Sequence, residues 1–199
     1  MKTFVNSLSI FRICAAFAII PTLMMQWYWV SLILFALGAI SDWMDGYLAR
    51  KFNVCTKLGG VLDHIGDKLL VVITFIMLAL MMRFWFIIIP IIIMIARELY
   101  ISGLREFLGT QKIEMPVPKA RFSMGKIKTT LQMIAITLFL MLFAVSAVVT
   151  PETISRKLLI TMNLLSQIGI ITLWFALVAS LWSATQYTFT FAEKLKKIK

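Results

Sequence analysis

Long apolar stretches separated by short polar breaks dominate the chain. Splitting them at the breaks predicts six membrane-spanning helices, at Phe4–Met25, Tyr28–Arg50, Gly59–Met82, Phe84–Phe107, Ile127–Val149 and Leu158–Phe191. Most contain about 22–24 residues, enough to cross a hydrocarbon core about 30 Å thick. The breaks at Gln26 and Arg83 are so short that we expect each to join a helical hairpin. The pattern predicts an all-α polytopic membrane protein that forms one domain over residues 1–199.

The composition agrees with this pattern. Hydrophobic residues make up 61% of the chain, charged residues make up 15%, and the mean hydropathy is +0.93. A soluble domain of this length could not bury so much apolar surface, so lipid must be its main solvent. The first apolar stretch contains Arg12 and lacks a small-residue cleavage site, and we interpret it as a membrane helix rather than a signal peptide. Cys14 and Cys55 define no disulfide framework and are expected to be free thiols.

The distribution of charge predicts the topology. The chain has 20 lysines and arginines against nine acidic residues, and a net charge of +11. With six spans, all but three of these basic residues fall on the side of the termini or at the helix ends next to it; the exceptions are Arg83, Arg156 and Lys157. The positive-inside rule therefore predicts that both termini are cytoplasmic. Because topology and anionic headgroups explain the charge, no nucleic-acid partner is expected.

Four of the nine acidic residues gather where the second predicted helix meets the third. Asp42 and Asp45 share one face of the second helix, and Asp63 and Asp67 lie one turn apart on the third. The connection is short, so the two helices pack antiparallel and can turn these faces together. Carboxylates gathered at a membrane edge repel one another and require a positive partner. Their oxygen ligands suit Mg²⁺ or Mn²⁺, and two such ions could be shared in phosphoryl chemistry.

The residues between the aspartates also favour a phosphate-bearing ligand. Gly46, Gly59 and Gly60 remove side chains where a nucleotide would approach, and Arg50 supplies a forked donor for a phosphate. Thr56 is a plausible N-cap for the third helix. In a simpler alternative, each aspartate pairs with a nearby lysine or arginine on a solvated helix rim. That alternative suits any one aspartate, but it explains neither four at this spacing nor the glycines between them.

From Asp42 to Asp67 the chain reads D-x₂-D-G-x₂-A-R-x₈-G-x₃-D-x₃-D. This pattern resembles the signature of the CDP-alcohol phosphatidyltransferase family. The resemblance implies a six-helix membrane enzyme, usually a homodimer, with a polar cavity facing the cytosol. It implies that Asp42, Asp45 and Asp63 are metal ligands and that Asp67 is both a ligand and the general base. It also implies contacts to the CDP part of a CDP-diacylglycerol donor from Gly46, Ala49, Arg50, Thr56 and Gly59.

The N-terminal segment NSLSIFR resembles the N-x-L-[ST]-x-x-R segment of the same family. The resemblance implies that Asn6, Ser9 and Arg12 lie near the nucleotide. Family members often carry D-P-x-A-D-K, whereas this chain has His64 at the proline position and Gly66 at the alanine position. Neither is an acidic signature residue, so the chemistry is expected to persist. His64, the only histidine, is expected to lie off the metal-binding face.

Further basic residues indicate the acceptor. Arg97 and Arg105 project from the cytoplasmic half of the fourth predicted helix, and Lys126 and Lys128 open the fifth. Such cations beside a metal site suit a second, anionic substrate. The segments IARELYISGLRE, GKIKTTLQM and LWSATQY resemble the phosphatidylglycerophosphate synthases of the family. That resemblance implies glycerol 3-phosphate as the acceptor, with its phosphate bound by these four residues.

Two glutamates beside those arginines, Glu98 and Glu106, are expected to orient them by ion pairing. Three alternatives remain: the same chemistry with inositol phosphate, serine or phosphatidylglycerol; a divalent-cation transporter; and a non-catalytic scaffold. The position of the acids at one membrane face disfavours transport, and the spacing of glycine and arginine disfavours a scaffold. A short N-terminus without a transit peptide favours a bacterial plasma membrane, with the active site facing the cytoplasm.

Overall fold

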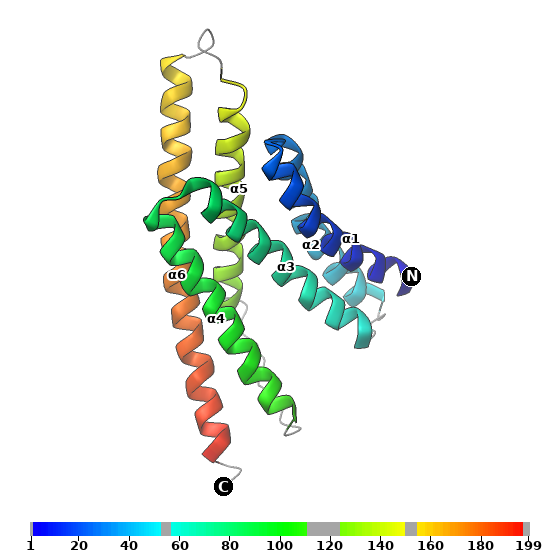
Figure 1. The fold of residues 1–199 in the computed structure, drawn as a ribbon. Helices are drawn as coiled ribbons and strands as arrows, with labels where there is room; N and C mark the ends of the chain where they lie inside the picture. Colours follow the sequence, from blue (N-terminus) through cyan, green and yellow to red (C-terminus); the bar gives the residue numbers. More distant parts are fainter. Residues whose placement is uncertain (1, 53–56, 111–123, 150–154, 197–199) are drawn as a thin grey trace. The chain divides into compact units, whose positions relative to one another are not determined.

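The structure is a computed structural model that describes residues 2–52, 57–110, 124–149 and 155–196. Side chains are described for all of these except residues 2–6, 42–43, 45–52, 57–58, 63, 124 and 196. The described residues form six α-helices, namely α1 (Lys2–Met24), α2 (Tyr28–Phe52), α3 (Lys57–Met82), α4 (Trp85–Thr110), α5 (Met124–Ser146) and α6 (Arg156–Lys196) (Figure 1). The six predicted helices are therefore confirmed, with ends that differ by a few residues.

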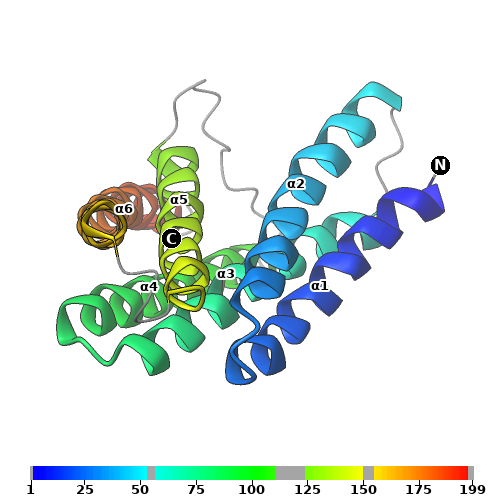
Figure 2. The ribbon, with the colours of Figure 1, turned by 90° about the horizontal axis from the view of Figure 1, so that it is seen from above.

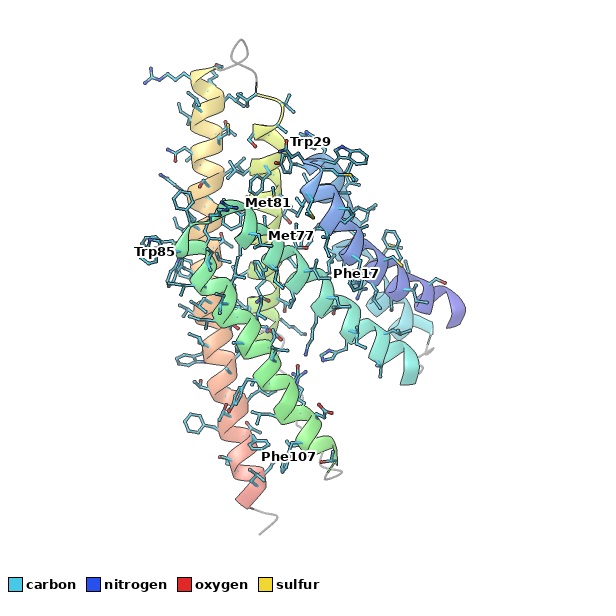
Figure 3. The ribbon with its side chains drawn as sticks, in the orientation of Figure 1. Phe17, Trp29, Met77, Met81, Trp85 and Phe107 are labelled. Atoms are coloured by element: carbon cyan, nitrogen blue, oxygen red, sulfur yellow. The ribbon has the colours of Figure 1, made fainter. Side chains whose placement is uncertain are left out.

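Five of the described helices, all except α2, are long and apolar enough to cross a membrane. The apolar part of α2 is shorter, Tyr28–Ser41, because the polar residues of the signature occupy the rest of that helix. Large apolar side chains cover the surface: Phe17 is 54% exposed and Trp85 is 60% exposed (Figure 3). Lipid provides the apolar surroundings that these side chains need, as expected for an integral membrane protein.

The chain divides into two compact units. The first unit consists of Met1–Met82 and Met133–Gly169, and the second of Arg83–Gln132 and Ile170–Lys199. The boundary crosses α5 and α6, so each of these two helices contributes residues to both units. A short link at Arg83, which has a φ of 50°, follows α3 and precedes α4.

In the first unit, α1 packs against both α2 and α3 (Figure 2). Gln26 ends α1 with a φ of 61°, and the amide of Trp27 donates to the carbonyl of Thr22 at 2.8 Å. The amide of Gln26 donates to the carbonyl of Leu23 at 3.1 Å, which completes a Schellman motif. Ser31 Oγ then donates to Thr22 Oγ1 at 2.8 Å and ties α2 to α1. The predicted hairpin at Gln26 is confirmed.

Small residues set the close approach of helices in this unit. A Cβ atom at Gly38 would lie 2.8 Å from Leu70 Cδ2, so glycine is what lets α2 pack on α3. A Cβ atom at Gly169 would lie 3.0 Å from the ring of Phe139, which brings α6 close to α5. The buried apolar side chains of the unit include Ala16, Ile19, Leu23, Phe35, Leu70, Phe75, Leu78, Ile136, Phe139 and Leu140.

In the second unit, α4 and α6 run in the same direction (Figure 1). Their contacts advance together along both helices, from Phe86 with Trp174, through Arg97 with Ser183, to Phe107 with Phe191. The start of α5 runs the other way along α4, because Lys128 pairs with Glu98 while Gln132 Nε2 donates to Met94 Sδ. The cationic residues at the end of α4 and the start of α5 therefore belong to one end of this unit.

Candidate active site

A buried arginine links α1 and α3 in the first unit. The side chain of Arg12 is fully buried, and its Nη1 donates to Asp67 Oδ1 at 2.5 Å. The Asp67 side chain remains 35% exposed. A guanidinium buried without a counter-charge would be strongly destabilising, so this carboxylate is part of what makes Arg12 tolerable inside the helices. The predicted base is thus held by the last residue of the NSLSIFR segment.

Arg12 also contacts α2, just before the first predicted metal ligand. Arg12 Nε lies 3.4 Å from Ser41 Oγ, and Ser41 Oγ donates to the carbonyl of Gly38 at 2.7 Å. Ser41 precedes Asp42 in the chain, so α1 joins the beginning of the signature on α2 to its end at Asp67 on α3. Gly38 packs on Leu70, whereas the later residue Ser41 and the earlier residue Asp67 share Arg12, so α2 and α3 are antiparallel, as predicted.

Gly66 lies where α1 comes closest to this part of α3. A Cβ atom there would lie 3.4 Å from the carbonyl oxygen of Ser9 and 3.5 Å from Arg12 Cδ. Ser9, a predicted nucleotide contact, is itself buried. These are ordinary van der Waals distances, so the alanine that is common in the family would also fit at position 66, beside the stem of Arg12.

Most of the predicted donor site lies outside the described residues or side chains, namely Asn6, Asp42, Asp45, Gly46, Ala49, Arg50, Thr56 and Asp63. Gly59, a predicted contact to CDP, is described and buried. The backbone of the four signature aspartates lies in continuous helix, in α2 for the first two and in α3 for the last two, as predicted. Among the described side chains, no group of three or more His, Cys, Asp or Glu could hold a metal ion. Metal binding therefore stays a prediction.

The second unit contains an ion-paired cluster built from two of its helices. Glu98 accepts a hydrogen bond from Arg97 Nη1 at 3.2 Å and pairs with Lys128 Nζ. Arg97 and Lys128 are both buried, while Glu98 is 20% exposed. Arg97 Nη2 also donates to Ser183 Oγ on α6 at 3.0 Å, so the cluster holds α4, α5 and α6 together. The predicted orienting role of Glu98 is thus supported by its contacts.

One guanidinium nitrogen of this cluster has no acceptor among the described residues. Arg97 Nε is buried with no hydrogen-bond partner in the part of the chain that the structure describes, while Nη1 and Nη2 of the same group contact Glu98 and Ser183. A buried donor without an acceptor is costly, and a buried guanidinium attracts an anion. The cluster is therefore suited to a phosphate or carboxylate ligand.

Arg105 lies further along α4 and contacts the same helix as Arg97. Its Nη2 donates to Tyr187 Oη at 2.9 Å, and its guanidinium carbon lies 5.0 Å from the centre of the Tyr187 ring. Tyr187 and Ser183 are one turn apart on α6, so successive turns of that helix contact the two predicted acceptor arginines. Lys126 and Glu106 are exposed and pair with no described charged side chain, so the structure does not bring these two into the cluster.

Ser183 and Tyr187 were not predicted as site residues. Both belong to the segment LWSATQY, which resembles the phosphatidylglycerophosphate synthases. Their spacing puts them on one face of a helix. That spacing was the available signal. Neither side chain is charged. The sequence alone therefore does not distinguish this serine and this tyrosine from other polar residues on the surface of a long apolar helix.

The comparison with known families assigns the chain to a class. The family described as CDP-alcohol phosphatidyltransferase matches residues 2–182, which takes in residues of both units. The chain therefore belongs to the CDP-alcohol phosphatidyltransferase family, and the resemblance carried by the aspartate signature is confirmed.

The names of individual relatives describe a narrower activity than the family description does. A protein of Sodalis glossinidius is 33% identical over 92% of this chain and 91% of its own length. A protein of Pectobacterium atrosepticum is 34% identical over 90% of both chains. A protein of Rickettsia bellii is 39% identical over 68% of this chain and 74% of its own length. Each of these bacterial proteins is named CDP-diacylglycerol–glycerol-3-phosphate 3-phosphatidyltransferase.

Proposed function

We propose that the chain transfers the phosphatidyl group from CDP-diacylglycerol to glycerol 3-phosphate, and that it releases phosphatidylglycerophosphate and CMP. Relatives that bear this activity in their names match about nine-tenths of the chain. The structural observation that carries the choice of acceptor is the buried cluster of Arg97, Glu98 and Lys128, in which Arg97 Nε has no acceptor among the described residues. The phosphate of glycerol 3-phosphate carries up to two negative charges and can pair with this guanidinium more strongly than the single carboxylate of zwitterionic serine.

The acceptor phosphate binds, in this proposal, to Arg97, Arg105, Lys126 and Lys128. The guanidinium of Arg97 is fixed from two sides, by Glu98 and by Ser183, before any ligand arrives. Such prior fixing lowers the entropy lost on binding and orients the phosphate relative to the rest of the acceptor. Arg105 and the exposed Lys126 supply further charge at the same end of the second unit.

The donor binds through the signature on α2 and α3, with Asn6, Ser9, Gly46, Ala49, Arg50, Thr56 and Gly59 contacting its CDP part. The carboxylates of Asp42, Asp45, Asp63 and Asp67 form an oxygen donor set of the kind that Mg²⁺ or Mn²⁺ prefers. The helical spacing of the four residues is compatible with two such ions. Bound there, the ions would neutralise the charge that develops on the diphosphate of the donor.

Asp67 accepts the proton of the acceptor's 1-hydroxyl group in the proposed reaction. That hydroxyl oxygen forms a bond to the β-phosphorus of CDP-diacylglycerol as the bond from this phosphorus to the oxygen of CMP breaks. The proton lost by the alcohol is held by Asp67 and later passes to water. Positioning of the two substrates and stabilisation of charge supply most of the rate in such transfers.

The distribution of basic residues supports an active site that faces the cytoplasm of a bacterial inner membrane. A site at the membrane edge lets a soluble acceptor meet a donor whose acyl chains stay in the bilayer. We further propose a homodimer, as the family resemblance implies.

The test is an assay of purified protein in detergent or vesicles with CDP-diacylglycerol and one labelled alcohol at a time. We expect labelled lipid and an equal amount of CMP with glycerol 3-phosphate. Lipid formed instead with inositol phosphate, serine or phosphatidylglycerol would reassign the acceptor. Absence of CMP release with all four alcohols would refute the proposed transferase activity and favour the alternative of cation transport.

A further inference from the structure

We propose that Arg12 is a positioning residue that fixes the orientation of the Asp67 carboxylate for phosphatidyl transfer, an inference that rests on the proposed function. Arg12 and Lys2 are the only charged residues in α1, and the rest of the helix around Arg12 is apolar or small. The Arg12 side chain is completely buried and contacts Asp67 Oδ1 at 2.5 Å. It therefore acts on the reacting groups through Asp67.

Arg12 contacts two different helices with different nitrogen atoms. Nη1 contacts Asp67 on α3, and Nε lies 3.4 Å from Ser41 Oγ on α2. A guanidinium is planar, so two fixed nitrogens determine the position of the whole group. Because the group holds Oδ1 of Asp67, it also limits rotation of that carboxylate about its Cβ–Cγ bond, and the direction of the second oxygen is set with the first.

Packing around Arg12 prevents its stem from moving away. The stem lies against the backbone of α3 at Gly66, where a Cβ atom would lie 3.5 Å from Arg12 Cδ. One turn further along α1, Ala16 is fully buried, so α1 approaches its neighbours closely on this side. That distance is an ordinary van der Waals contact, so α3 packs directly beside the arginine stem.

A purely structural role does not require an arginine at this position. A buried ion pair is often no more stabilising than apolar residues of similar volume. Of the helices that Arg12 contacts, α2 is already joined to α1 at the other end by the hydrogen bond from Ser31 to Thr22 at 2.8 Å. What an apolar side chain cannot do is hold one oxygen of a partly exposed carboxylate at a fixed point.

The test compares Arg12→Met, Arg12→Lys and the control Ser31→Ala, with kcat, the KM of each substrate and the thermal midpoint measured for each. Misplacement of a catalytic group by about 1 Å can cost about 100-fold in rate, so Arg12→Met is expected to lower kcat by about that factor. Arg12→Lys keeps a charge but cannot make both contacts, and should lower kcat by about tenfold. The KM of each substrate should change by less than about threefold, because the fully buried Arg12 side chain acts through Asp67 even if it lies near the nucleotide.

Ser31→Ala removes a partly buried hydrogen bond between α1 and α2, at the end of these helices away from Ser41, and should lower only the thermal midpoint. The inference is overturned if folded Arg12→Met or Arg12→Lys keeps the kcat of the wild type, or if activity falls only with the folded fraction, as in the control. If Arg12→Met does not fold, Arg12→Lys decides by the same criterion. A wild-type protein that releases no CMP with glycerol 3-phosphate would overturn the proposed function and this inference together, whereas an active wild type with unaffected Arg12 variants overturns this inference alone.

Discussion

Lys128, near the start of α5, forms an ion pair with Glu98 on α4, and both side chains are largely withdrawn from the surface. Glu98 also accepts a hydrogen bond from Arg97, so one carboxylate holds two cations from different helices. Removal of one member of such a buried network leaves the others uncompensated, which costs more than the network contributes when complete. The relationship makes Glu98 the most informative residue for testing the acceptor cluster.

Glu98→Gln should make the second unit less stable in the absence of substrate and more dependent on an anionic ligand. Glutamine keeps the size and an acceptor oxygen but loses the charge that compensates Arg97 and Lys128. Glycerol 3-phosphate can then supply the missing negative charge, so the rise in thermal midpoint on its addition should be larger than in the wild type. The measurement is thermal unfolding in detergent across a series of glycerol 3-phosphate concentrations.

The matched control for this variant is Glu106→Gln. Glu106 lies on the same helix but is exposed, and it pairs with no described basic side chain. The control should resemble the wild type in both thermal midpoint and ligand response. Equal ligand responses in Glu98→Gln and the wild type would show that the cluster does not bind the acceptor phosphate.

Arg105→Ala should weaken binding of the acceptor more than it slows the chemical step. A hydrogen bond between charged groups contributes about 1.5–3 kcal/mol, which corresponds to an increase in KM for glycerol 3-phosphate of about 10–150-fold. The KM for CDP-diacylglycerol should stay near its wild-type value. Arg156→Ala, which removes an exposed arginine at the start of α6, is the control. An unchanged acceptor dependence in Arg105→Ala would remove this residue from the acceptor site.

Tyr187→Phe tests whether Arg105 must be held in place. The hydroxyl of Tyr187 accepts a hydrogen bond from Arg105 at 2.9 Å, while its ring lies beneath the guanidinium and would remain in the variant. We expect an increase in KM for glycerol 3-phosphate of about 2–10-fold, smaller than in Arg105→Ala because the charged guanidinium remains and loses only its support. Tyr100→Phe removes the neighbouring contact between α4 and α6, from Tyr100 to Thr188 at 3.3 Å, and should leave this KM unchanged. Equal effects of the two variants would assign Tyr187 to helix packing.

The helices could be predicted from the sequence because the apolar stretches are long and their breaks are sharp. The turn at Gln26 shows the limit of that approach. A glutamine with a φ of 61° takes the place usually given to glycine, and only the hydrogen bonds to Thr22 and Leu23 reveal the motif. Spacing along one helix could also place Asp63 and Asp67 one turn apart, because that spacing depends on the helix alone.

Partners from distant parts of the chain could not be predicted in this way. Ser183 and Tyr187 lie about 80 residues beyond the arginines that they contact, and nothing in their own segment indicates which helix they face. Lys126 and Lys128 look equivalent in the sequence, yet one is exposed and the other is buried against Glu98. Two residues along a helix correspond to a rotation of about 200°, so only one of the two can face α4.

Asp67→Asn should leave a folded protein with essentially no turnover. Asparagine keeps an oxygen that can accept a hydrogen bond from Arg12, so the link between α1 and α3 persists in weakened form. The neutral amide cannot take a proton from the acceptor hydroxyl, and it is a poorer ligand for a hard cation. CMP release and the thermal midpoint should be measured on the same preparation. Activity near the wild-type level in folded Asp67→Asn would eliminate Asp67 as the base.

Removal of divalent cations should abolish CMP release without unfolding the helices. Chelation by EDTA followed by exchange into metal-free buffer takes away the charge that neutralises the donor diphosphate, and Mg²⁺ or Mn²⁺ added back should restore the rate. Circular dichroism should show unchanged helix content, because the helices are held by apolar packing and hydrogen bonds. Mn²⁺ bound to the protein can also be counted by electron paramagnetic resonance, and Asp63→Asn should reduce it. Full activity in the chelated protein, together with no bound Mn²⁺, would mean that the four aspartates act without a metal.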